Sequence, residues 1–131
     1  MIQNMLFMNI VLDFKRAFYI MIMEIKVLSF NRDEVQAAIM RQLLHTEEQG
    51  REFYVKNLVI NEKSPISAVM TIERSSGRIE KKNLDQGFLA ASMLRYCIDN
   101  KIPMARNSNK DLHVLNGMLS LFLSMETKNL R

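Results

Sequence analysis

The sequence predicts an α+β fold in which an antiparallel sheet carries two helices packed on one face. Segments that alternate apolar and polar residues are interspersed with two amphipathic segments of helical period. Within residues 18–124 the order is β-α-β-β-α-β, which is typical of a split βαβ sandwich. The chain of 131 residues is 48% hydrophobic, with only four Gly and two Pro. It is therefore long enough to bury a core, and it is neither low-complexity nor collagen-like.

Residues 1–17 predict an apolar N-terminal helix or appendage. Asn9, Asp13 and Arg16 fall in one stripe at helical spacing, and the other positions are largely Met, Leu, Ile, Val and Phe. So wide an apolar face must cover the sheet of its own domain or contact a second subunit, and the sequence leaves both alternatives open. Asp13, Lys15 and Arg16 cost too much in a bilayer centre, so we expect no membrane span.

A second hypothesis is that residues 1–22 are translated upstream sequence. Met23 begins MEIKVLSF, which is a plausible start for the domain. No Lys or Arg precedes the apolar run Met5–Leu12, which argues against a secretory signal. The single cysteine, Cys97, excludes an internal disulfide and a Cys-based zinc site. We therefore expect a reducing compartment, the cytoplasm.

Residues 18–125 are expected to form a single α+β domain that opens with a strand and a helix. The strand over 18–30 alternates, with Tyr19 through Val27 at odd positions on the face expected to point inward and Glu24 and Lys26 on the other. Asn31 and Glu34 form a capping-box pattern for the first helix, which is expected to end near Gly50. Its buried stripe is expected to be Val35, Ala38, Ile39 and Leu43.

Two antiparallel strands, a second helix and a hairpin are expected to follow. The strands span 52–60 and 66–74, because both are rich in β-branched and apolar residues. Asn83 with Gln86 is expected to cap the second helix, which Pro103 ends. Asn116-Gly117 predicts a C-terminal β-hairpin, and 126–131 are expected to be a polar tail. The expected buried stripe of the second helix is Leu84, Phe88, Ala91, Leu94 and Ile98.

No group of residues predicts catalysis, and we expect a non-enzymatic protein without cofactor or metal. His45 and His113 have no second ligand at metal-binding spacing, so they are expected to occupy a helix end and a strand. Cys97 has no base beside it on its helix and is expected to be an inert thiol. The four glycines are scattered, so no phosphate-cradling loop can be drawn.

The basic residues of the second half predict a phosphate or nucleic-acid contact. Residues 1–65 hold eight Lys/Arg and eight Asp/Glu, whereas residues 66–131 hold ten and six, so the whole net charge of +4 lies there. Plain solvation of these residues is the competing interpretation, and no aromatic residue is interleaved to stack on bases. The candidate contacts are Arg78, Lys81, Lys82, Lys101, Arg106 and Lys110.

The sequence leaves two hypotheses about the function of the protein. The preferred hypothesis is a small interaction protein that forms a homodimer through its apolar N-terminal element and its Met-rich sheet. Eleven methionines and many apolar residues, with no chemical motif that uses them, favour this hypothesis. The alternative is a nucleic-acid-binding or regulatory module that uses the basic surface of residues 78–110.

Overall fold

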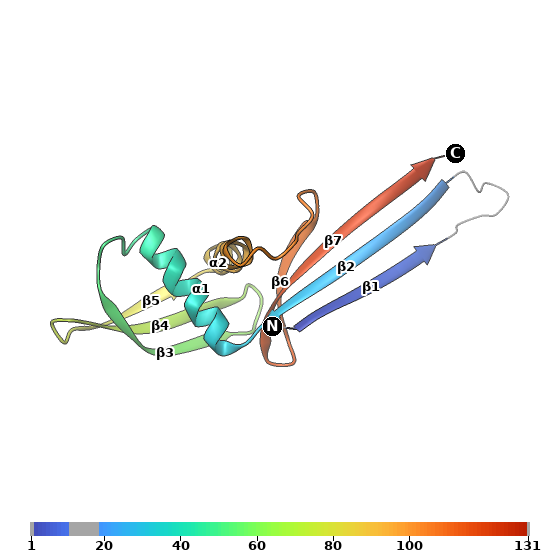
Figure 1. Cartoon of the computed structure of the whole chain (residues 1–131). Coiled ribbons are helices and arrows are strands. Elements are labelled where there is room, and N and C mark those ends of the chain that lie inside the picture. Colours follow the sequence, from blue (N-terminus) through green and yellow to red (C-terminus); the bar gives the residue numbers. More distant parts are fainter. Residues whose placement is uncertain (1, 11–18, 131) are drawn as a thin grey trace.

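The protein has an α+β fold of seven strands and two helices (Figure 1). A computed structural model describes residues 2–10 and 19–130, and it describes side chains for residues 24–125. In chain order the elements are β1 (Ile2–Ile10), β2 (Tyr19–Phe30), α1 (Arg32–His45), β3 (Phe53–Asn61), β4 (Ser67–Arg74), β5 (Ile79–Leu84), α2 (Gln86–Asp99), β6 (Asn109–Leu115) and β7 (Met118–Leu130).

The strands form two antiparallel sheets instead of the one that the sequence predicts. The longer sheet has the order β1-β2-β7-β6, and the shorter sheet has the order β3-β4-β5. Helices α1 and α2 lie together on one face of the shorter sheet (Figure 1). The longer sheet runs past this two-layer body, and β1, β2 and β7 extend beyond the helices as a three-stranded ribbon (Figure 1).

Helix α1 has the cap and the buried face that the sequence predicts. The Asn31 side chain accepts from the Glu34 backbone N–H at 2.8 Å, and the Glu34 carboxylate accepts from the Asn31 N–H at 2.9 Å. The buried residues are Val35, Ala38, Ile39 and Leu43. These positions recur at helical spacing, so the apolar stripe fixes which side of the helix faces the sheet.

Helix α2 differs from the prediction in its cap and in its buried face. Its N-cap is Asp85, whose side chain accepts from the Phe88 N–H at 2.8 Å, and Asn83 belongs to β5. Strand β5 was missed because it is short and highly charged. Because its N-cap is Asp85 and not Asn83, α2 starts two residues later than predicted. Its buried residues are Leu89, Ser92, Met93 and Cys97, while Ile98 is 66% exposed.

The face of β2 that is buried is the opposite of the predicted one. Leu28 and Phe30 are buried, and Val27 on the other face is half-buried. Lys26 therefore lies on the same face as Leu28, because side chains alternate along a strand. On β7 the equivalent positions Leu119, Leu121 and Leu123 are buried. The Ser29 and Ser120 hydroxyls, both buried, are 2.8 Å apart between these two strands.

Both ends of the chain also differ from the prediction. Residues 2–10, expected in a helix, form strand β1, and the rest of that expected helix (11–17) lies outside the described residues. Residues 126–130, expected in a polar tail, continue strand β7. Asn116 and Gly117 join β6 to β7 with φ values of 53° and 76°, the paired positive angles of a type I′ hairpin turn.

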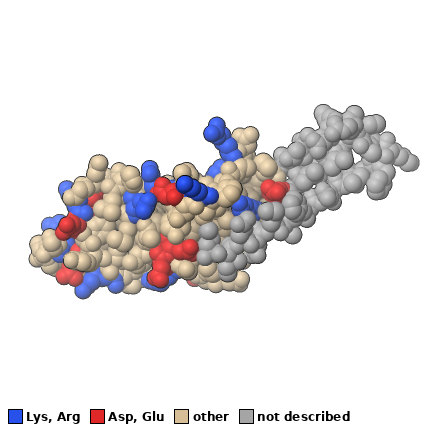
Figure 2. Space-filling view, viewed as in Figure 1, with Lys and Arg blue, Asp and Glu red and all other residues tan. Residues whose placement is uncertain are grey.

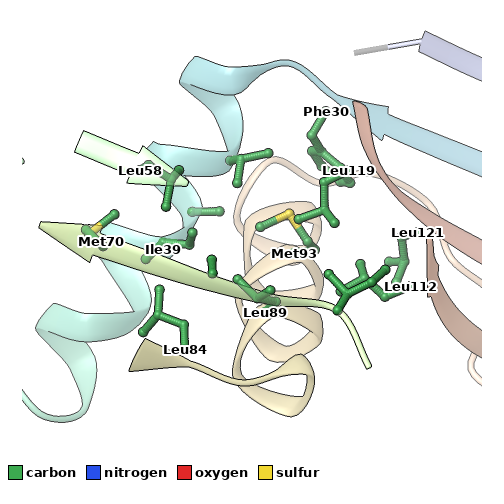
Figure 3. Packing of buried hydrophobic residues seen from close by; sticks show 14 of the residues in the cluster. Phe30, Ile39, Leu58, Met70, Leu84, Leu89, Met93, Leu112, Leu119 and Leu121 are labelled. Atoms are coloured by element: carbon green, nitrogen blue, oxygen red, sulfur yellow. The ribbon is translucent and has the colours of Figure 1, made fainter. Parts of the chain in front are cut away.

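One continuous hydrophobic core joins the two sheets through the helices. Figure 3 shows Leu58, Met70 and Leu84 of the shorter sheet on one side of this core and Leu119 and Leu121 of the longer sheet on the other. Met93 of α2 lies between them, and Ile39 of α1 lies among Leu58, Met70 and Leu84. Among residues with described side chains, the longer sheet contributes to this core at Leu28 and Phe30 of β2, Leu112 of β6, and Leu119, Leu121 and Leu123 of β7.

Candidate interaction surfaces

The six basic residues predicted to contact phosphate do not form one surface. Arg78, Lys81 and Lys82 lie at the β4–β5 turn and on β5, in the shorter sheet. Lys110 lies on β6 of the longer sheet, and Lys101 and Arg106 lie in the loop that precedes it. Lys and Arg side chains are interspersed with Asp and Glu over the face seen in Figure 2. The six residues therefore form two separate groups, one on the shorter sheet and one on the α2–β6 loop and β6.

In the first group, Arg78 and Lys82 are held by carboxylates. Arg78 Nη2 lies 2.8 Å from Glu80 Oε2, and Lys82 Nζ lies 2.6 Å from Glu48 Oε2. The Glu48 carboxylate is only 1% exposed. Lys82 faces inward because it alternates with the exposed Lys81 and pairs with Met70 of β4. Only Lys81 of this group is exposed and without an ion pair among the described residues.

Arg74 is the centre of a buried ionic cluster around Glu48. Its guanidinium binds Glu48 through two nitrogens, at 2.5 and 3.1 Å, and its Nε lies 2.7 Å from Glu80. Hydrogen bonds from Arg74, and further interactions with Lys82, lower the pKa of Glu48 from 4.5 to about 2 against the opposing effect of burial. This cluster clamps the loop after α1 to strands β4 and β5, so it has a structural role.

In the second group, Lys101 occupies an unusual backbone position. The Lys101 N–H donates to the Ile98 carbonyl at 3.1 Å, and the Ile102 N–H donates to the Cys97 carbonyl at 2.9 Å, which is a Schellman helix ending. Lys101 is the residue with left-handed φ, at 56°. Glycine is usual there, because this conformation costs other residues about 1–2 kcal/mol. The chain thus places a long cation where glycine would be more stable.

The structure adds Lys26, which the sequence analysis did not select, to this second group. Lys26 Nζ donates to the Pro103 carbonyl at 2.6 Å, and Lys110 Nζ donates to the Ser108 carbonyl at 2.9 Å. Strand β7 lies between β2 and β6, and its residue Leu123 is the cross-strand partner of both Lys26 on β2 and Lys110 on β6. They therefore lie on one face of the sheet, two strand spacings or about 10 Å apart.

Cys97, His45 and His113 lie in three different parts of the described structure, namely α2, the end of α1 and β6. Cys97 is fully buried, and burial raises the pKa of its thiol to about 11, so it is a thiol at neutral pH. His45 is exposed at the end of α1, and the His113 ring packs edge-on against Phe122 with centroids 5.0 Å apart. In residues with described side chains, no three His, Cys, Asp or Glu are grouped to hold a metal ion.

The outer part of the three-stranded ribbon of β1, β2 and β7 has no second layer among the described elements. In Figure 1 no helix lies on either face of its outer part. Its strands contain long apolar runs in sequence, such as Tyr19–Met23 in β2 and Met5–Met8 in β1. The outer part of the ribbon therefore consists of strands whose sequences are largely apolar.

Comparison with protein-family models, with curated proteins and with solved structures finds no match for this chain. Within the residues that the structure describes, neither helix has the length and apolar character needed to cross a bilayer.

Proposed function

We propose that this protein is a small interaction protein that self-associates through the ribbon of β1, β2 and β7. The observation that carries the proposal is a single-layer ribbon rich in apolar residues that projects from the folded body (Figure 1). A sheet face of this composition is normally covered, because exposing it to water costs roughly 25 cal/mol per Å² of apolar surface. A second copy of the same chain offers the same surface as its complement.

The edges of the sheets support the same proposal. In the described sheets β1, β3, β5 and β6 are edge strands. Exposed edges are normally protected from pairing by charged residues or bulges. The other three edge strands contain such charges. They are Lys56 in β3, Glu80, Lys81 and Lys82 in β5, and Lys110 and Asp111 in β6. Strand β1, with the sequence IQNMLFMNI, contains none. We therefore place the contact between copies at β1 and the adjoining ribbon.

Sedimentation velocity of the full chain tests this proposal. We expect the wild type to sediment as a dimer at tens of micromolar, a concentration scale at which an ordinary weak dimer forms. Ile22→Lys adds a charge to β2, where Ile22 pairs with Asn9 of β1, and is expected to give a monomer. Ile79→Lys on β5, where Ile79 is 53% exposed, is the matched control and is expected to remain dimeric.

Two results would overturn the proposal. One is a monomeric wild type at this concentration, and the other is an Ile22→Lys variant that sediments like the wild type. If circular dichroism shows that Ile22→Lys has lost its fold, Asn9→Lys on the edge strand β1 takes its place, with the same expectation. A single added lysine is the usual device by which natural edge strands avoid pairing.

The alternative function, nucleic-acid binding by the whole surface of residues 78–110, has less support. Its β5 half is largely neutralised by Glu48 and Glu80. In the β5 half only Lys81 lacks an ion-pair partner among the described residues, whereas in the other half Lys101, Arg106 and Lys110 all lack one.

A further inference from the structure

We infer that the loop between α2 and β6, together with Lys26 of β2, binds the phosphate backbone of nucleic acid without reading its sequence. The cationic loop patch consists of Lys26, Lys101, Arg106 and Lys110. This inference is independent of self-association through the ribbon. The loop leaves α2 and returns to the longer sheet beside β7, standing out from the body (Figure 1).

The architecture of the loop presents its cations outward. Ile102 and Met104 are half-buried and pack against the core, which anchors the loop at its base. Ser108 then closes a turn on the Ala105 carbonyl, with its backbone N–H at 3.2 Å and its hydroxyl at 2.7 Å. Arg106 and Asn107 are exposed within this turn, so their donors point to solvent from an anchored loop.

Lys26 and Lys110 support the loop and still have donors to offer. Each ammonium group donates one described hydrogen bond to a loop carbonyl, Pro103 or Ser108. An ammonium has three N–H donors, so two remain on each for phosphate oxygens. The approximately 10 Å separation of these lysines across β7 lets them contact different phosphates of one backbone. Lys101 and Arg106 have no ion-pair partner among the described residues.

Few acidic residues oppose the charge of the patch. No acid occurs between Asn100 and Lys110. Asp99 is paired with Arg41 at 3.0 Å, and Asp111 lies on the opposite face of β6 from Lys110 because side chains alternate. Glu24 is the one acid on the Lys26 face of β2 among residues with described side chains. The neutral donors Asn100, Asn107 and Asn109 complete a surface suited to phosphate contacts.

The backbone of Lys101 is the second, independent observation. Glycine would satisfy the same Schellman ending without strain, yet the chain has a lysine at φ 56°. A strained residue that does not serve packing, and is itself exposed, indicates a role for its side chain. The absence of aromatic residues from 97 to 112 favours backbone contacts over base stacking, and hence duplex over single-stranded ligands.

Fluorescence anisotropy with a fluorescein-labelled 20-base-pair DNA duplex tests the inference on the full chain. At 50 mM NaCl we expect binding whose logarithmic salt dependence has a slope of about −3 to −4, as four phosphate contacts require. Lys101→Glu/Arg106→Glu is expected to weaken binding at least tenfold. Lys63→Glu/Lys81→Glu changes the net charge equally at exposed sites away from the patch, and it is expected to weaken binding less than threefold.

Lys101→Gly separates a binding role from a structural one. It relieves the left-handed strain, so the urea midpoint is expected to rise, while affinity falls and the salt slope shrinks by about one. If Lys101 had only a structural role, Lys101→Gly would not raise the urea midpoint and at the same time lower the affinity for the duplex. A scrambled duplex of equal length is expected to bind equally well, because backbone contacts carry no sequence information.

Several outcomes would overturn the inference. They are no binding at 50 mM NaCl, equal losses for the two double variants, and unchanged affinity for Lys101→Gly. Lipid vesicles containing phosphatidylserine present another phosphate source. Co-sedimentation of the protein with these vesicles, without duplex binding, would also exclude nucleic acid as the ligand. Ile22→Lys keeps all four residues of the patch, so sedimentation and duplex binding of this one variant distinguish a failure of the proposed self-association from a failure of this inference.

Discussion

Glu48→Gln tests the reasoning about the buried ionic cluster most directly. The substitution keeps the size of the side chain and removes its charge. Lys82 then loses the carboxylate at 2.6 Å, while Arg74 keeps Glu80 at 2.7 Å. Removing one partner of a buried ion pair costs about 3–5 kcal/mol, because the remaining charge stays desolvated. Since Arg74 keeps one partner, we expect the lower end, about 3 kcal/mol.

The pKa of Glu48 gives the same magnitude by a second route. Its pKa falls from 4.5 to about 2 in the folded state, and each unit corresponds to roughly 1.4 kcal/mol. The ionised carboxylate therefore stabilises the fold by about 3 kcal/mol at neutral pH. Because the folded-state pKa is lowered, this stabilisation is present above about pH 4.5 and is lost as the pH falls toward 2.

Urea unfolding of wild type and Glu48→Gln at several pH values between 7 and 3 measures both quantities. We expect the difference in unfolding free energy to be about 3 kcal/mol at pH 7 and to shrink steadily below pH 4.5. Glu47→Gln, an exposed neighbour without a described ion pair, is the control and should change stability by less than about 0.5 kcal/mol. A difference below about 1 kcal/mol at pH 7, or one independent of pH, would refute this account of the cluster.

Three further predictions concern the core, a turn and the first strand. Cys97 should react with Ellman's reagent at pH 8 at least a hundredfold more slowly in the native protein than in urea, because the thiol is buried and its pKa is about 11; equal rates would contradict its burial. Gly117→Ala should lower the unfolding free energy by about 1 kcal/mol because φ is 76°, whereas Gly87→Ala in α2 should raise it; the same sign for both would contradict the turn assignment. Self-association through β1 requires that the natively expressed protein contain residues 2–10, so its intact mass should correspond to a start at Met1. A product that starts at Met23 would lack β1 and would support the hypothesis of translated upstream sequence.

The elements that the sequence predicted well are those with strong local patterns. Helix α1 combines a capping box with four apolar residues at helical spacing, and the structure confirms both. Strand β5 was missed because Glu80 and Lys82 occupy positions that normally carry apolar residues in a half-buried strand. Their partners Arg74 and Glu48 come from β4 and from the loop after α1. No local pattern can show that such distant charges neutralise one another.

The candidate binding surface could be predicted only in part for a similar reason. The α2–β6 loop was found because its cations are close in sequence. Lys26 lies 77 residues before Pro103, and the buried face of β2 is the opposite of the predicted one. In a strand with apolar residues at nearly every position, alternation does not distinguish the two faces. The pairing of β2 with β7 decides which face of β2 is buried, and this pairing joins residues that are far apart in the sequence.

The pairing of β2 with β7 has a consequence for folding during synthesis. Ser29 and Ser120, which face each other in this pair, are separated by 91 positions. At about 5–20 residues per second, a ribosome needs roughly 5–20 seconds to deliver β7 after β2 has emerged. The shorter sheet and both helices become available in that interval, so we expect them to fold first. During this time one edge of an apolar strand stays open, and that interval is when the nascent chain is most exposed to aggregation.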